Sequence, residues 1–295
     1  MWIYDVNNNM PAQINRMIRV LLAVILFPVF FSCTEEIEIT LDESYTRLVV
    51  EGAITTDTMA HEIKLTTTTS YFYPEKAPVV QNAILAISDG INNYPLTEVY
   101  PGTYQTAPDV FGVPGRAYKL NIELANPIGG YSVYEASSLL HDVNELDSVT
   151  MEFHPEWTTE GIWEVKCFVQ EPPTKDFYRF LIYKNNKIFT PNIRYWFVIE
   201  DKYFNGSYAN GAPVSYFNQG DPYEKLNAGD TIGVEVNRIT KEYYDFILQV
   251  QAEVIGSYPL FSGPPANVKG NISNGAIGFF AAYDKTMKST ITPDF

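Results

Sequence analysis

The sequence predicts a mainly β protein, in which an N-terminal Ig-like Greek-key β-sandwich is followed by a second β-rich domain that carries one amphipathic helix. Short segments that alternate apolar and polar residues recur along most of the chain, as half-buried strands require. Turn signals such as Asp89-Gly90 and Pro101-Gly102 separate these segments. One segment, Thr240 to Ile255, has helical spacing instead.

The first 32 residues are predicted to be a signal peptide. Two arginines precede the apolar run Val20 to Phe31, and Ser32 stands directly before Cys33. This layout is typical of a secretory signal, and it resembles a bacterial lipoprotein signal. As a helix the 12-residue run spans roughly 18 Å, which is too short for about 30 Å of hydrocarbon. We expect Met17 to be the true start and Cys33 to carry lipid at the mature N-terminus.

Residues 33–45 are predicted to form an acidic tether. Glu35, Glu36 and Glu38 follow the lipid site closely. They serve either as a solvated spacer or as an export signal, because they resemble the acidic signal that sends Bacteroidota lipoproteins to the outer face of the outer membrane. We therefore expect an outer-membrane, lipid-anchored and surface-exposed protein.

The charge balance excludes several kinds of partner. The formal net charge is −15, whereas nucleic acids are bound mainly through Lys and Arg. The same charge disfavours electrostatic docking on an anionic lipid surface. Membrane attachment is therefore expected to come from the lipid, and no nucleic acid partner is predicted.

Residues 46–140 are predicted to form the sandwich. Roughly seven short strands in about 100 residues are typical of this fold. The clearest strand patterns cover residues 48–54, 61–66, 83–88, 118–124 and 131–136.

Residues 141–295 are predicted to form the second domain, because the β pattern lapses between Leu139 and Leu146. Strand patterns resume at residues 148–153, 163–169, 177–183, 193–199 and 231–236, and residues 200–224 are predicted to be a long polar loop. The helix, at about 240–255, begins with Thr240 as N-cap and is followed by Gly256.

Chemistry-bearing motifs are scarce. Cys167 lies on the apolar face of a strand pattern and is expected to be a buried thiol. His61, His141 and His154 have no metalloprotease spacing, and His141 with Asp142 is expected to be solvated. The sequence has no CxxC, GxSxG, Walker loop or GxGxxG motif. We predict no catalytic residue, no cofactor and no metal ligand, although a carboxylate pair of a hydrolase or a loosely built calcium site leaves no sequence signature.

Tyrosines among Asn, Gly and Ser mark the predicted loop at 200–224. This composition is typical of adaptable recognition surfaces. The alternative is that the rings form a small core beneath the loop. The candidate contact residues are Tyr203, Tyr208, Tyr216 and Tyr223.

Several segments resemble the Bacteroidota lipoprotein family DUF4249, a domain of unknown function. They are Cys33 to Ile39, Arg47 to Gly52, Ala86 to Gly90, Pro101 to Tyr104, Tyr118 to Leu120 and Asn271 to Phe280.

Members of this family tend to be encoded beside TonB-dependent outer-membrane receptors. The resemblance therefore implies a non-catalytic accessory of such a receptor, or a surface protein that binds a small ligand, glycan or peptide. The alternative is a surface hydrolase of glycans or peptides that uses an unrecognised carboxylate site.

Overall fold

The computed structural model describes residues 46–69, 76–142, 145–256 and 268–294, and residues 45–295 belong to one compact unit. The predicted signal peptide, Cys33, the tether and its glutamates lie outside the described residues.

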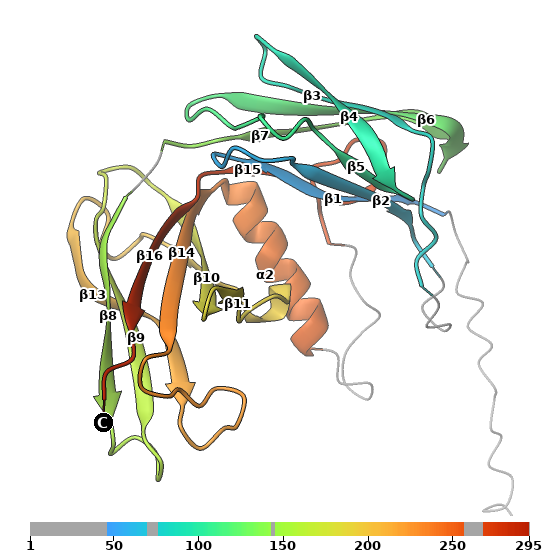
Figure 1. The fold of residues 1–295 in the computed structure, drawn as a ribbon. Helices are drawn as coiled ribbons and strands as arrows, with labels where there is room; N and C mark the ends of the chain where they lie inside the picture. The colour runs from blue at the N-terminus through green and yellow to red at the C-terminus, as the bar shows by residue number, and fades with distance from the viewer. Residues whose placement is uncertain (1–45, 70–75, 143–144, 257–267, 295) are drawn as a thin grey trace, which may run out of the picture. The chain divides into compact units, whose positions relative to one another are not determined.

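Eight strands pair in the order β15-β1-β2-β5-β4-β3-β6-β7 (Figure 1). Their bounds are β1 Leu48–Thr55, β2 Glu62–Thr67, β3 Ile84–Ser88, β4 Asn93–Tyr100, β5 Thr103–Gln105, β6 Ala117–Ile128, β7 Tyr131–Leu139 and β15 Ile277–Tyr283.

This sheet folds over on itself at β4. Residues 93–96 of β4 pair with β3, whereas residues 97–100 pair with β5. In Figure 1, β3, β6 and β7 form one layer, and β15, β1 and β2 form the other. Alternate apolar side chains from both layers, such as Val50 and Leu65 facing Leu85 and Leu120, fill the core between them.

The strand β15 comes from the C-terminal part of the chain yet pairs with β1 in parallel. Its sequence IGFFAAY is nearly all apolar, and Phe279 to Ala282 are buried. Strands that are covered on both sides lose the alternation that marks a half-buried strand. This strand therefore carries no clear β signal in the sequence.

Two further sheets pack against each other. One contains β13 (Tyr208–Asn218), β9 (Ile162–Gln170) and β8 (Leu146–His154) in that order. The other has the order β11-β10-β14-β16, with β12 paired to β10, and its bounds are β10 Phe177–Lys184, β11 Lys187–Ile188, β12 Phe197–Glu200, β14 Thr231–Ile239 and β16 Thr286–Ile291. Trp163, Val165 and Cys167 of β9 face a core shared with Ile182 and Val234.

The helix α2 (Lys241–Gly256) confirms the helical prediction. Thr240 Oγ1 accepts a hydrogen bond from the Tyr243 amide at 3.2 Å and so caps the first turn. Ile247 packs on Phe177. Gln251 donates to two carbonyls beside the short 3-10 turn η2 (Ile193–Tyr195), those of residues 193 and 196.

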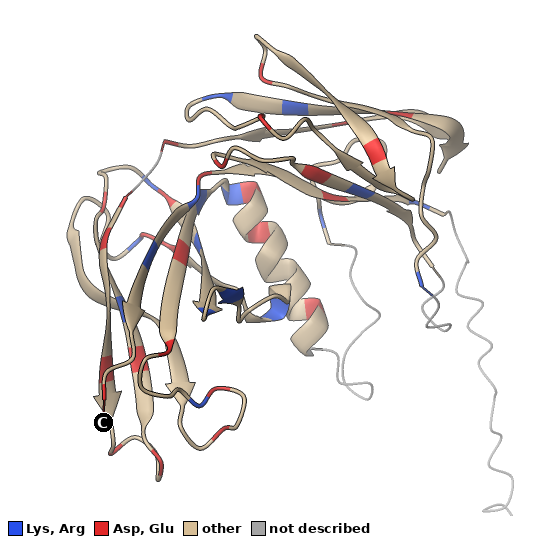
Figure 2. Ribbon diagram, in the orientation of Figure 1, with Lys and Arg blue, Asp and Glu red and all other residues tan. Residues whose placement is uncertain are grey.

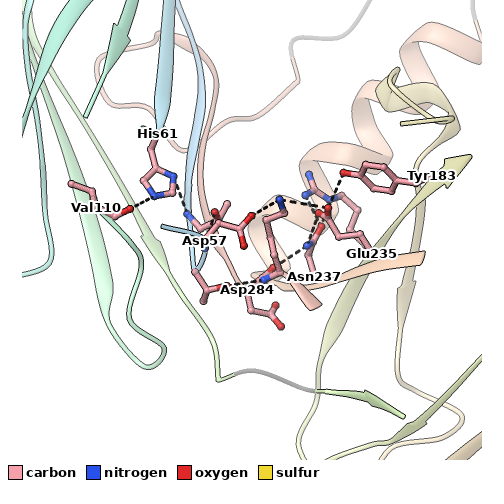
Figure 3. A network of polar contacts seen from close by, with 11 residues as sticks. Asp57, His61, Val110, Tyr183, Glu235, Asn237 and Asp284 are labelled. Carbon is pink, nitrogen blue, oxygen red and sulfur yellow. Dashed lines mark hydrogen bonds and ion pairs between the residues drawn. The ribbon is translucent and has the colours of Figure 1, made fainter. Parts of the chain in front are cut away.

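A partly buried polar network joins the turn after β1 to β14 (Figure 3). Lys285, between β15 and β16, lies 2.6 Å from Asp57 Oδ2 and 3.7 Å from Glu235 Oε2. Glu235 also accepts hydrogen bonds from Tyr183 at 2.8 Å and from Asn237 at 3.0 Å. One ammonium thus lies between two carboxylates, and these contacts tie the connection between β15 and β16 to the turn after β1 and to β14.

The mainly β prediction is confirmed, and two local predictions are wrong. Residues 193–199 are only partly strand, because η2 precedes β12. Residues 200–224 are not one loop, because they contain β13. The Ig-like Greek-key detail and the division between residues 140 and 141 stay predictions. Within the described ranges, no helix has both the length and the apolar character that a membrane crossing requires.

Candidate contact surface

The four predicted contact tyrosines are all exposed, but they do not form one patch. Tyr208 and Tyr216 stand on β13 and are 47% and 48% exposed. Tyr203 and Tyr223 are 87% and 86% exposed, in the turns before and after β13. The 11 residues of β13, at about 3.3 Å each, separate these turns by about 30 Å.

Two bulges explain why β13 has no clean alternation in the sequence. Its pairing with β9 shifts between Asn210 and Ala212 and again between Pro213 and Ser215. Each bulge adds one residue to the strand and reverses the inward and outward positions. As a result Tyr208 lies opposite Gln170 and Tyr216 opposite Glu164, both on the face of β9 that points away from the core.

This outward face of the three-stranded sheet, with the adjacent turn, is called the β9 face here. It carries Glu152, His154, Trp157, Glu164, Lys166, Tyr208 and Tyr216.

Aromatic rings form the centre of the β9 face. The His154 ring stacks on Trp157 with centroids 3.8 Å apart and planes 5° from parallel. The Tyr216 ring lies 6.0 Å from Trp157. Trp157 is 46% exposed, so one side of the stack faces solvent. Large rings that are held in place and half exposed offer contact area at a low entropic cost.

Hydrogen bonds fix this cluster from below. Glu164 is only 8% exposed, and its Oε2 lies 3.2 Å from His154 Nε2 and 3.0 Å from Lys166 Nζ. The Tyr216 hydroxyl donates to the other oxygen at 3.4 Å. Burial alone would raise the pKa of Glu164, but the hydrogen bonds from Lys166 and His154 lower it overall. Glu164 is therefore an ionised acceptor that holds three side chains of the face.

Trp157 was not singled out in the sequence, because its role depends on the turn between β8 and β9. The Trp157 amide donates to the His154 carbonyl at 3.4 Å and closes a turn. This turn brings the Trp157 indole into contact with the His154 imidazole. Gly161 closes the turn with φ +80°, and a Cβ there would meet the Phe153 ring at 2.3 Å. Only contacts across the turn show that Trp157 and Tyr216 belong together.

Other rings of residues 200–224 point inward. Phe217 is fully buried and packs on Phe189 with centroids 5.0 Å apart. Phe204 lines a small cavity in the second core together with Tyr178. Both interpretations of the aromatic segment therefore apply, each to different rings: Phe217 belongs to the core, Phe204 lines the cavity, and four tyrosines remain on the surface.

Among the described residues, two groups of side chains have ligand atoms close enough for a metal ion. Glu152, His154 and Glu164 form the first group, on the β9 face. Lys166 already bridges its two carboxylates, and an ammonium ion in that position supplies the charge that a metal would bring. Glu171, Asp176 and Asp201 form the second group, which is buried.

Within the second group, the carboxyl of Glu171 has a strongly shifted pKa. Burial raises its pKa to about 7, in the range of a general acid. The adjoining cavity measures about 50 Å³, which is room for about one water molecule rather than a substrate. Nothing at this carboxyl therefore resembles an accessible catalytic cleft.

Two further sequence expectations are settled here. Cys167 is 2% exposed, and burial raises the pKa of its thiol to about 11, so the buried-thiol prediction is confirmed. His141 is half-buried rather than solvated. Burial and the nearby Arg238 lower its pKa. The residue lines a groove of about 630 Å³ beside the start of α2.

The fold and this surface define a mainly β protein with half-exposed aromatic rings on one face of a sheet. The profile of a domain of unknown function (DUF4249) matches residues 34–289, and the chain belongs to this family. A search of curated proteins finds no match.

Proposed function

We propose that this chain is a non-catalytic, lipid-anchored protein of the outer cell surface that acts as the accessory of a TonB-dependent outer-membrane receptor. The β9 face is its contact surface for the receptor. The observation that carries this proposal is the pair of half-exposed rings, Trp157 and Tyr216, which lie beside His154 and are fixed by Glu164. Tyr and Trp dominate the binding energy of many interfaces.

The charge pattern supports a protein partner. Figure 2 shows acidic residues distributed over many strands with lysines and arginines scattered among them. Glu152 and Glu156 border the rings, so a basic or hydroxyl-rich segment complements the rim of the cluster. A cation can also stack on the exposed indole face.

The anchor and its export rest on the sequence. Cys33 follows a signal layout, and Glu35, Glu36 and Glu38 follow Cys33. Several acyl chains at about 0.8 kcal/mol per buried CH₂ hold a protein on a membrane. The Cys33→Ala variant is expected to leave the membrane fraction or to stay unprocessed, and immunoblots of fractionated cells measure this. Normal processing and wild-type membrane levels would contradict the anchor.

The contact surface is tested by copurification from native outer membranes. The double variant Trp157→Ala with Tyr216→Ala is expected to retain less than about a tenth of the receptor that the wild type retains, because each ring contributes about 1–2 kcal/mol. Tyr203→Ala with Tyr223→Ala removes two exposed rings outside the β9 face and is the matched control. If both double variants retained equal amounts of receptor, the β9 face would not be the contact surface.

A surface hydrolase is the second candidate. The pair Glu152 and Glu164 on the β9 face is the observation that favours it, since two carboxylates near a ring stack suit a sugar. Lys166 holds both carboxylates, and the pKa of each is lowered, Glu152 chiefly by its hydrogen bond from Lys166. Neither is then suited to donate a proton. Release of reducing sugar from surface glycans that is lost in Glu164→Gln would favour this candidate over the accessory role.

A further inference from the structure

Three carboxylates meet where three strands end. Glu171 follows β9 directly, Asp176 precedes β10, and Asp201 follows β12. The pairing of β10 with β12 brings the last two together, and the Asp201 amide donates to the Asp176 carbonyl at 3.1 Å. One carboxylate oxygen from each residue lies within 4.8 Å of the other two.

All three residues are buried, at 2%, 3% and 1% exposure in chain order. Among the described residues, Arg238 pairs with Asp176, with Nη2 2.5 Å from Asp176 Oδ1 and Nε 2.8 Å from the same oxygen. The nearby Lys175 pairs with Glu200 instead, at 2.7 Å. Three carboxylates and one guanidinium leave a net charge of −2 when all are ionised, and such a buried charge is costly without compensation.

Two of the three carboxylates accept hydrogen bonds from neighbouring hydroxyl groups. Asp176 Oδ2 accepts from the Thr174 hydroxyl at 2.7 Å, and Glu171 Oε1 accepts from the Tyr178 hydroxyl at 2.7 Å. Asp201 differs, because neither of its carboxylate oxygens has a hydrogen-bond partner although both are buried. A carboxylate that faces two others without a donor points to a missing positive charge.

We propose that Glu171, Asp176 and Asp201 bind a divalent cation, and that Ca²⁺ is the preferred ion. Two oxygens that are each about 2.4 Å from one calcium ion are at most about 4.8 Å apart, which matches the observed spacing. One divalent ion also cancels the net charge. The ligands are all carboxylates, so the site lacks the nitrogen and sulfur donors typical of zinc sites.

Calcium rather than magnesium fits the way the site is built. Its ligands come from three strand ends of irregular geometry, and Ca²⁺ tolerates such geometry, whereas Mg²⁺ demands a near-octahedral shell and keeps its waters. The bound ion links the end of β9, the start of β10 and the turn after β12 that carries Tyr203. It therefore stabilises the second core without belonging to the β9 face.

Calorimetric titration of the chelator-treated full chain with CaCl₂ tests the site. We expect one calcium ion per chain and a melting temperature that rises by at least about 5 °C at saturation, with a smaller rise for MgCl₂. Absence of binding at millimolar calcium would overturn the proposal.

The variant Asp201→Asn locates the ion. It keeps the shape of the side chain and removes one charge, so we expect at least a tenfold loss of calcium affinity. In chelator the variant is expected to be no less stable than the wild type, since it removes the unpartnered carboxylate. Asp109→Asn, at an exposed carboxylate, is the control and is expected to keep wild-type affinity. If Asp201→Asn does not fold, Glu171→Gln provides the same measurement. Wild-type affinity in either variant would place the calcium elsewhere.

Discussion

Arg179 shows how a single buried residue organises the second half of the chain. It is 2% exposed, and its Nε and Nη2 donate to Asn237 Oδ1 at 2.9 and 2.6 Å. Its guanidinium also lies 4.6 Å from the Trp196 ring centre and 4.3 Å from that of Tyr283. Planar stacking and a fixed fork of donors are properties of arginine that lysine lacks.

We therefore expect Arg179→Lys to be destabilising although it keeps the charge. The loss should be about 2 kcal/mol or more in the free energy of unfolding, because the lysine leaves donors and acceptors of a buried network unsatisfied. Arg194→Lys, at an exposed arginine, is the control and should change stability by less than about 0.5 kcal/mol. Urea denaturation measures both. Equal stability of the two variants would contradict this role of Arg179.

His61 is predicted to make stability depend on pH. Burial lowers its pKa below the usual 6.5, and the neutral ring donates from Nε2 to the Val110 carbonyl at 3.2 Å (Figure 3). The unfolded chain then binds a proton at a higher pH than the folded chain does. The contribution of His61 to the free energy of unfolding therefore falls as the pH drops below about 6.5, and it is constant at higher pH.

Urea midpoints of the wild type and of His61→Gln between about pH 5 and pH 8 measure this effect. The variant is expected to lose part of the slope on the acid side. His141 has a pKa shifted in the same direction, so His141→Gln shows how much of the remaining slope belongs to it. An unchanged slope in His61→Gln would show that His61 is not the residue responsible.

At the scale of elements, β15 depends on a glycine. Gly278 has φ +96°, and a Cβ at this position would lie 2.0 Å from the Val50 carbonyl oxygen of β1. Gly278→Ala is expected to cost more than about 2 kcal/mol, from strain and a backbone clash together. Gly275→Ala is the control, because it has φ +72° but no atom within 4 Å of the new Cβ. Thermal unfolding should separate them, and similar melting temperatures would argue against the close β1–β15 contact.

The sequence predicted elements well where local signals decide them. Thr240 and Gly256 bound the helix almost as expected, because caps act within one turn. β13 escaped prediction, since two bulges and Pro213 interrupt its alternation. β15 escaped because both of its faces are covered. In both cases the decisive contacts come from strands far away in the chain.

The sequence predicted only part of the candidate surface, because its residues come together through contacts between distant segments of the chain. Composition selected Tyr208 and Tyr216, and these two share the β9 face. Tyr203 and Tyr223 have the same local composition but lie in separate turns. Trp157 joins the cluster from the turn after β8, and no spacing rule connects it to Tyr216.

For the whole molecule, the proposed accessory role rests on the aromatic rings that the three-stranded sheet presents on the β9 face. A rigid sheet holds the rings in place, and the predicted lipid at Cys33 would keep this sheet near the membrane. If the proposed function is right, the β9 face touches the receptor on intact cells.

Photo-crosslinking on intact cells tests this claim most directly. A photoreactive amino acid in place of Tyr216 is predicted to give a covalent adduct that contains a TonB-dependent receptor. The same residue in place of Tyr100, an exposed tyrosine on the first sheet, is predicted to give none. No receptor adduct from position 216, or equal adducts from both positions, would contradict the account.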